Sequence, residues 1–194
     1  MSSPTLMLFL ELDGVLVLNG STKRALVADA IRTIAAGESK WMDNQELWDQ
    51  LFDPEPTRQL KILHDRFDPL YCLTSDWTAL MDRPAMLHVL RLSGLGFVAN
   101  NLHTRWETGG THTQSHFVEA IETWLGINPD HNSLWAAVDS ERRDSVQQNL
   151  PATYAEFTVL CCRDVGLTNF ETERLQAAFL HRLQTSELAQ RGFQ

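Results

Sequence analysis

Residues 6–14 read LMLFLELDG, and this stretch indicates the fold class. Residues 6–12 form an apolar run broken only by Glu11, as expected of a central parallel strand that helices cover on both faces. The run ends in Asp13-Gly14. Segments with helical and strand-like patterns alternate after it, which is typical of a parallel α/β sheet. We therefore predict a three-layer α/β sandwich.

The remaining elements follow from apolar spacing and from turn residues. Further strands are predicted at 70–73, 97–100, 134–138 and 157–161. Helices are predicted at 22–36, 41–52, 57–67, 82–92, 115–125 and 171–183. Residues 103–114 (HTRWETGGTHTQ) read as a polar loop. We expect residues 1–194 to form one domain with a small helical insertion at about 20–68, too short for a large cap, so the site should be open.

Composition limits the partners and the compartment. The chain has 16 basic and 25 acidic residues and a net charge of −9, which disfavours extended nucleic-acid binding but leaves room for a local phosphate pocket. Cys72, Cys161 and Cys162 lack metal-binding spacing and are expected to be buried thiols. With no signal-like or membrane-length apolar segment, we expect a cytoplasmic protein with no membrane partner.

Polar side chains gather at the predicted strand ends, where ligands of such sheets bind. Asp13 follows the first strand, Thr74 and Ser75 follow the second, and Asp139 follows the fourth, with Asp144 five residues further on. Carboxylates beside hydroxyl groups suit Mg²⁺ and a phosphate group.

Three segments resemble, in order, the motifs of the haloacid dehalogenase-like (HAD) superfamily: LFLELDGVLV (8–17), YCLTSDW (71–77) and LWAAVDSERRD (134–144). The tail CRDVGLTNFETERLQAAFL (162–180) and the LTSDW segment are similar to the HAD domains of Swiss Army Knife RNA-repair proteins. The resemblance implies a Rossmannoid sheet and Mg²⁺-dependent phosphatase chemistry.

Carried over residue by residue, the resemblance assigns roles to the strand-end residues. Asp13 matches the general acid/base, Thr74 the phosphate-binding hydroxyl and Asp139 a metal ligand. Asp144 matches a second acidic member. Ser75 lies beside Thr74 and joins it as a phosphate-binding candidate.

Two positions depart from the family pattern. Glu11 stands where the family has its nucleophilic Asp, and the helix predicted at 115–125 lacks the usual Lys at its start, with His116 as the nearest candidate. The extra methylene of Glu moves the carboxylate by about 1.5 Å, and a misplacement near 1 Å can cost on the order of 10²-fold in rate. Glu11, with Asp13, can still ligate Mg²⁺, so we expect weakened catalysis and surviving metal binding.

Simpler interpretations stay open for these residues. Asp13-Gly14 could form a plain turn, and Thr74, Ser75 or Asp139 could cap helices. Several other polar or aromatic residues could be surface or packing residues without chemistry: Asp144, His116, Arg142, Arg143, His103, His112, Trp77 and Trp106.

Two functions therefore remain. The first is an HAD-like phosphohydrolase that acts on a phosphomonoester, such as a nucleotide or a nucleic-acid end, with Glu11, Asp13 and Thr74 as catalytic residues. The second is a non-catalytic HAD-fold protein that binds a ligand or a protein partner.

Overall fold

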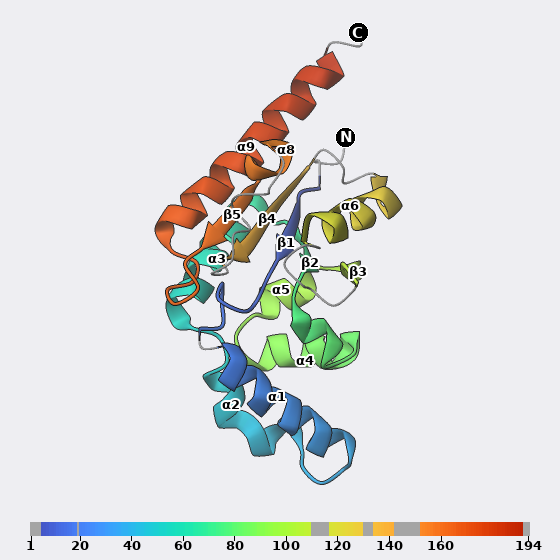
Figure 1. Ribbon diagram of the computed structural model, residues 1–194, viewed down its shortest axis with the longest axis vertical. Coiled ribbons are helices and arrows are strands. Elements are labelled where there is room, and N and C mark those ends of the chain that lie inside the picture. The colour runs from blue at the N-terminus through green and yellow to red at the C-terminus, as the bar shows by residue number, and fades with distance from the viewer. Residues whose placement is uncertain (1–4, 19, 110–116, 130–133, 142–151, 192–194) are drawn as a thin grey trace.

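The computed structural model describes residues 5–18, 20–109, 117–129, 134–141 and 152–191. Five strands form one parallel sheet in the order β3-β2-β1-β4-β5, with helices on both faces (Figure 1). The strands are β1 (Met7–Leu10), β2 (Leu70–Leu73), β3 (Leu102–Glu107), β4 (Trp135–Ser140) and β5 (Thr158–Cys161). The α/β prediction with a parallel Rossmannoid sheet is confirmed.

The central strand is β1, and its apolar sequence explains that place. All four of its residues are buried, because β2 and β4 cover its edges and helices cover its faces. Leu10 pairs with Leu73 of β2 and with Val138 of β4. Since all strands run the same way, the segments that follow β1, β2 and β4 meet at one edge of the sheet.

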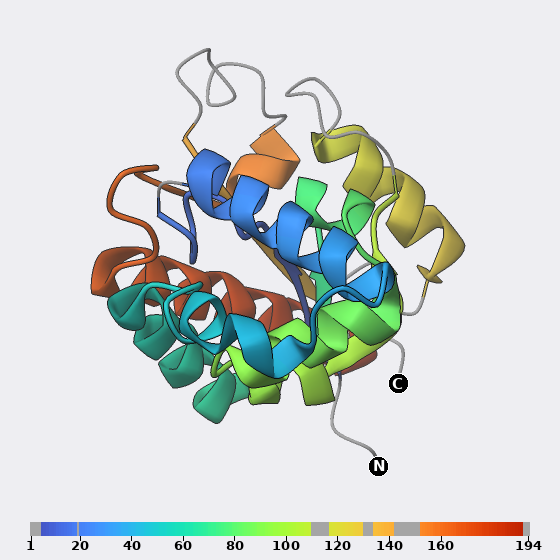
Figure 2. The ribbon, with the colours of Figure 1, turned by 90° about the horizontal axis from the view of Figure 1, so that it is seen from below.

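Helices form the two outer layers, as the view in Figure 2 shows. On one face, Trp124 of α6 packs edge-on against Phe9 of β1, with ring centroids 5.3 Å apart. On the opposite face, Phe67 of α3 meets Phe179 of α9, also at 5.3 Å. The helices are α1 (Gly20–Ala35), η1 (Trp41–Asn44), α2 (Gln45–Asp49), α3 (Pro54–Phe67), η2 (Asp76–Ala79), α4 (Arg83–Leu92), α5 (Gly96–Asn100), α6 (Phe117–Ile127), α8 (Ala152–Ala155) and α9 (Asn169–Arg191).

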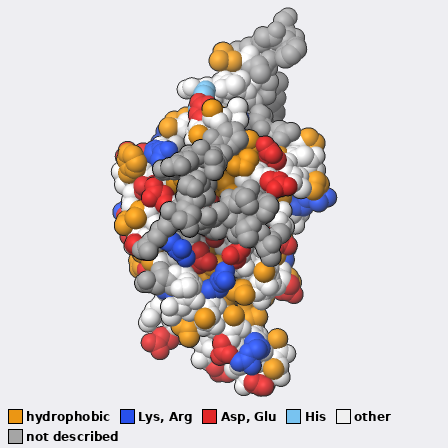
Figure 3. Space-filling model, viewed as in Figure 1, with side chains coloured by type: hydrophobic (Ala, Val, Ile, Leu, Met, Phe, Trp, Pro, Cys, Tyr) orange, Lys and Arg blue, Asp and Glu red, His pale blue; other side chains and the backbone are white. Residues whose placement is uncertain are grey.

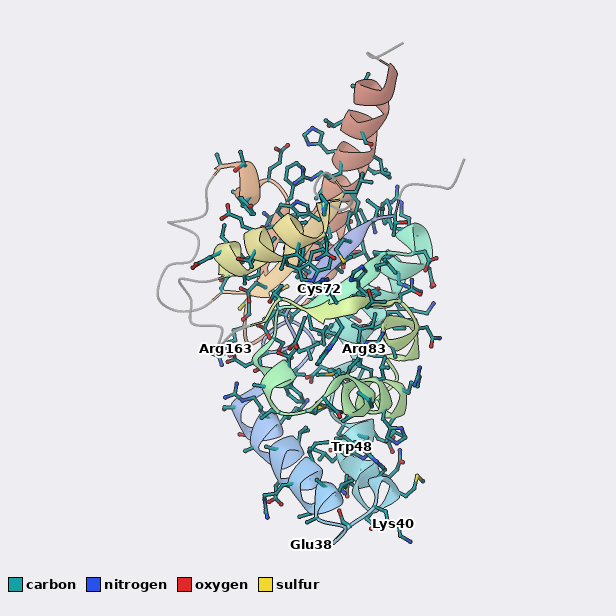
Figure 4. All side chains as sticks on the ribbon, turned by 90° about the vertical axis from the view of Figure 1, so that its right-hand side faces the viewer. Glu38, Lys40, Trp48, Cys72, Arg83 and Arg163 are labelled. Atoms are coloured by element: carbon teal, nitrogen blue, oxygen red, sulfur yellow. The ribbon has the colours of Figure 1, made fainter. Side chains whose placement is uncertain are left out.

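A helical lobe made of α1, η1 and α2 lies beyond the carboxyl edge of the sheet, at the end of the molecule opposite the two termini (Figure 1). Trp48 is fully buried, and its indole N–H donates to the Trp41 carbonyl at 2.9 Å. Trp48 thus belongs to the core, and the partly buried Trp41 packs against it. Glu38 and Lys40 lie at the far tip of the lobe, away from Arg163 (Figure 4).

The third predicted strand was placed wrongly. Residues 97–100 belong to helix α5, and β3 lies at 102–107, almost entirely within the segment 103–114 that was predicted to be a loop. β3 is an edge strand, so the side chains of His103, Thr104 and Arg105 are at least partly exposed. Polar exposed residues at a sheet edge resemble a loop in sequence, which explains the error.

The cysteine prediction is correct in part. All three cysteines are free, and Cys72 and Cys161 are buried as expected. Cys162 is exposed, because it follows the last residue of β5 and leaves the sheet.

None of the described helices is both long and apolar enough to cross a membrane.

Candidate functional site

Glu11 lies at the carboxyl end of β1, with only 2% of its surface exposed. One of its carboxylate oxygens, Oε1, accepts three hydrogen bonds: from the backbone N–H groups of Leu12 at 2.8 Å and Asp13 at 3.1 Å, and from the Ser75 hydroxyl at 2.5 Å. The side chain therefore folds back over the turn that follows its own strand. Ser75 precedes η2 but makes no capping bond, so its hydroxyl serves Glu11 instead.

Burial and a neighbouring charge make Glu11 a weak acid. Loss of hydration and then the negative charge of Asp139 raise the pKa of Glu11 from 4.5 to about 8, against the hydrogen bonds from Ser75 and the Asp13 backbone. Asp139 is itself buried in β4, where its Oδ1 accepts the Ser140 N–H at 2.7 Å. The structure thus brings two of the predicted carboxylates together in a dry environment.

Asp13 is held by an indole. The Trp77 Nε1–H donates to Asp13 Oδ1 at 2.8 Å, and the Trp77 ring is fully buried. Burial raises the pKa of Asp13, while the Trp77 hydrogen bond and the charges of Arg24 and Arg163 oppose the rise. The packing interpretation of Trp77 was therefore incomplete. A hydrogen bond across 64 residues leaves no local signal that could have revealed it.

Two glycines allow the chain to close around Asp13. Gly14 adopts φ +73°, and a Cβ there would lie 2.7 Å from Ser140 Cβ and 2.8 Å from Arg163 Cγ. A Cβ at Gly20, the first residue of α1, would lie 2.2 Å from Asp13 Oδ1. Asp13-Gly14 does form a turn, closed by the Gly14 N–H donating to the Val17 carbonyl at 2.9 Å. That turn is also part of the site.

Thr74 lies beside Glu11, since its backbone N–H donates to the Leu10 carbonyl at 3.0 Å. Its side chain is 1% exposed, and its hydroxyl has no hydrogen-bond partner among the described residues. The hydroxyl oxygen of the partly buried Thr108 also has no hydrogen-bond partner among the described residues, and Thr108 lies next to Thr74, since its N–H donates to the Leu73 carbonyl at 3.2 Å. Thr108 escaped prediction because β3 was misplaced. A buried hydroxyl without a partner costs free energy unless a ligand or water supplies one.

Cationic side chains lie on the rim of the site. Arg24 of α1 pairs with Asp76 at 3.1 Å, and Arg163 follows β5 on the side of the sheet where the strands end (Figure 4). On the face seen in Figure 3, acidic and basic side chains lie close together where the carboxyl edge of the sheet meets the helical lobe. Sequence reasoning missed both arginines: Arg24 lies outside the quoted motifs, and Arg163 lies in the quoted tail but was given no role there.

The structure therefore groups five of the predicted site residues at one edge: Glu11, Asp13, Thr74, Ser75 and Asp139. His116 and Asp144 lie outside the described residues, as do Arg142, Arg143 and His112. Trp106 is a core residue of β3, and His103 packs against Trp124 at 5.0 Å.

A comparison with protein families decides the identity of the domain. A family model described as the HAD domain in Swiss Army Knife RNA repair proteins matches residues 7–171. The chain belongs to this family of HAD domains. Searches of curated proteins and of solved structures gave no significant match.

A metal ion at this site would have to be held by the carboxylates that meet there. Within the described part of the chain, no group of three or more His, Cys, Asp or Glu side chains is arranged to hold a metal ion. Mg²⁺ needs fewer protein ligands, because it keeps several waters and is often bound through one or two carboxylates and a substrate phosphate. Glu11 and Asp139 meet that requirement in ligand type. Burial is the main cause of the raised pKa of Glu11, and a cation would relieve the second cause, the repulsion from Asp139.

Proposed function

We propose that this HAD domain is a Mg²⁺-dependent phosphohydrolase that acts on a phosphomonoester and turns over slowly. The observation that carries the proposal is the meeting of Glu11, Asp13 and Asp139 with the unpartnered Thr74 hydroxyl at the carboxyl edge of the sheet. Buried carboxylates and a buried hydroxyl donor beside them suit a transferring phosphoryl group.

Asp13 is the general acid/base of the proposed reaction. Burial raises its pKa toward the working pH, which favours proton transfer in either direction. It takes a proton from the attacking water, whose oxygen bonds to phosphorus, and returns a proton to the alkoxide that leaves. Trp77 fixes one oxygen of Asp13 and so orients the other for this role.

Glu11 is a poor nucleophile in this arrangement. Its Oε1 already accepts three hydrogen bonds, and burial raises the pKa of its carboxyl group, which disfavours the ionised form that attack requires. Direct attack by water, assisted by Asp13, is therefore the favoured route. Slow turnover is the expected result of losing the covalent path.

The phosphate is bound by hydroxyl donors and, on the rim, by cations. Thr74 and Ser75 supply the hydroxyl groups, with His116 as a further candidate. Glu11 and Asp139 would hold Mg²⁺, with Asp13 and Asp144 as further candidate ligands, and the ion would neutralise charge on the phosphoryl oxygens. Arg24 and Arg163 are the nearest described substitutes for the missing Lys, since both charges act on Asp13.

The substrate class follows from charge and from the family. A net charge of −9 disfavours a long phosphate backbone and permits one terminal phosphate. The matching family is named for RNA repair proteins. We therefore place the substrate among nucleotides and nucleic-acid ends that carry a phosphomonoester.

A second function is favoured by one observation. Glu11 Oε1 occupies the backbone and hydroxyl donors at the strand end, so these donors are not available to a reacting phosphate. The site could then only bind a ligand or a protein partner, without catalysis. In that case the carboxylates would stabilise a binding surface, and no turnover would be measured.

Hydrolysis of p-nitrophenyl phosphate, of a nucleotide panel and of RNA oligomers with terminal phosphates, with and without Mg²⁺, separates the two functions. We expect slow, Mg²⁺-dependent release of phosphate that Asp13→Asn abolishes. Absence of turnover by a correctly folded protein on every substrate would overturn the phosphohydrolase proposal in favour of the binding function.

A further inference from the structure

The three donors that meet at Glu11 form a concave anion site. Two consecutive backbone N–H groups, of Leu12 and Asp13, point at one oxygen, and the Ser75 hydroxyl approaches the same atom from the neighbouring strand end. Consecutive N–H groups in a turn make a preformed anion-binding concavity. The atom that fills it here belongs to the protein itself.

We propose that the Glu11 carboxyl group is a tethered occupant of an oxyanion site, and that its removal opens this site to free inorganic phosphate. The tether is short: Glu11 directly follows β1, and the two N–H groups belong to the next two residues. No free anion has to be recruited, so the intramolecular contact wins over a dilute ligand.

The side-chain length explains why glutamate can do this. Its two methylenes let the carboxyl group fold back over the turn to reach the N–H of its immediate neighbour at 2.8 Å. The unpartnered Thr74 hydroxyl is the independent sign that a ligand belongs here. It lies beside Glu11, is 1% exposed, and has no acceptor or donor among the described residues.

The inference deepens the proposed function and rests on it in one respect, namely that the same donors would receive an oxygen of the substrate phosphate. Substrate binding then requires the Glu11 side chain to leave the donors, and this displacement limits affinity. The occupancy of the donors by Glu11 can be tested without any turnover.

The test measures binding of inorganic phosphate to the full chain in the presence of EDTA, by isothermal titration calorimetry and by ³¹P line broadening. Glu11→Ala removes the occupant and is expected to bind inorganic phosphate about tenfold or more tightly than the native protein, because the freed donors make charge-assisted hydrogen bonds. Glu11→Ser replaces the alanine variant if the latter does not fold.

Two controls decide the cause. Glu11→Gln keeps the length and an acceptor oxygen but no charge, so it should exclude phosphate as the native side chain does. Adding Ser75→Ala to Glu11→Ala should remove most of the gain. Equal gains for the Ala and Gln variants would overturn the proposal in favour of simple charge repulsion, and so would no gain for Ala or Ser. A gain in binding without turnover in any variant would leave the tethered occupant standing and count against the phosphohydrolase.

Discussion

The indole N–H of Trp77 donates a 2.8 Å hydrogen bond to the carboxylate of Asp13, and so ties η2, which comes after β2, to the turn after β1. The hydrogen bond opposes the rise of the Asp13 pKa that burial causes. The Trp77 ring also fills the core, so a substitution that keeps an aromatic ring and removes the N–H separates the effect of the hydrogen bond from that of packing.

Replacing Trp77 by Phe keeps most of the ring and removes the donor. We expect a loss of about 1 kcal/mol of stability and a higher pKa for Asp13. The acidic limb of the pH–rate profile should therefore shift upward, because Asp13 must be ionised to take the proton from water. Trp48→Phe is the matched control, since it removes an indole bond to the Trp41 carbonyl, away from Asp13. Equal shifts in both variants would contradict the assigned role of Trp77.

Gly20→Ala should damage the site through one methyl group. The added Cβ would lie 2.2 Å from Asp13 Oδ1, so Asp13 or the start of α1 must move, at a cost of about 1–3 kcal/mol. Gly126→Ala in α6 meets nothing within 4 Å and should be neutral or stabilising. Denaturant unfolding with an activity assay measures both, and a harmless Gly20→Ala would count against the described position of Asp13.

Stability should fall as pH rises from about 4.5 to about 8. The pKa of Glu11 is raised in the folded state, so folding favours its protonated form. Ionisation of Glu11 therefore costs no folding free energy below its unfolded-state pKa, and it costs the full amount above its folded-state pKa. The penalty is roughly a few kcal/mol. Urea unfolding between pH 4.5 and 9 should show a slope that flattens in Glu11→Gln, and parallel curves for the two proteins would refute the shift.

Glu11→Asp shortens the nucleophile-position side chain by one methylene. We expect kcat/KM for p-nitrophenyl phosphate with Mg²⁺ to rise, by up to about 10²-fold, because the carboxylate retreats by about one carbon–carbon bond toward the position that attack requires. Asp13→Asn in the same background should abolish the gain. An unchanged rate would indicate that more than Glu11 separates this site from an efficient phosphatase.

Mg²⁺ should stabilise the protein through Glu11 and Asp139. At a concentration tenfold above its Kd the ion would add about 1.4 kcal/mol, seen as a rise in Tm. Asp139→Asn should reduce that rise, whereas Asp29→Asn, which affects only an exposed ion pair on α1, should leave it intact. Equal Mg²⁺ responses in the two variants would exclude Asp139 as a ligand.

Much of the fold and part of the site could be predicted from the sequence. β1 and β2 were predicted because buried parallel strands are continuous apolar runs, and residues at their ends then fall at one edge of the sheet. β3 could not be predicted, since its exposed residues follow the pattern of a loop.

The finer geometry of the site could not be predicted, because it depends on contacts between distant segments. The donation of Ser75 to Glu11 spans 64 residues, and the position of Arg163 beside Gly14 depends on how β5 joins the sheet. The direction in which Glu11 folds back is set by the turn at Asp13-Gly14, which sequence alone shows only as a turn.

The pairing of β1 has a consequence for biosynthesis. Met7 pairs with Leu70 on one side and with Trp135 on the other, so the most apolar strand emerges from the ribosome long before either partner. Its backbone edges stay open until β4 has been translated, and closure of such long loops is slow. During that interval the nascent chain exposes an unpaired apolar strand that can aggregate. Folding of the newly made chain should therefore depend on chaperones, whereas the folded domain should not.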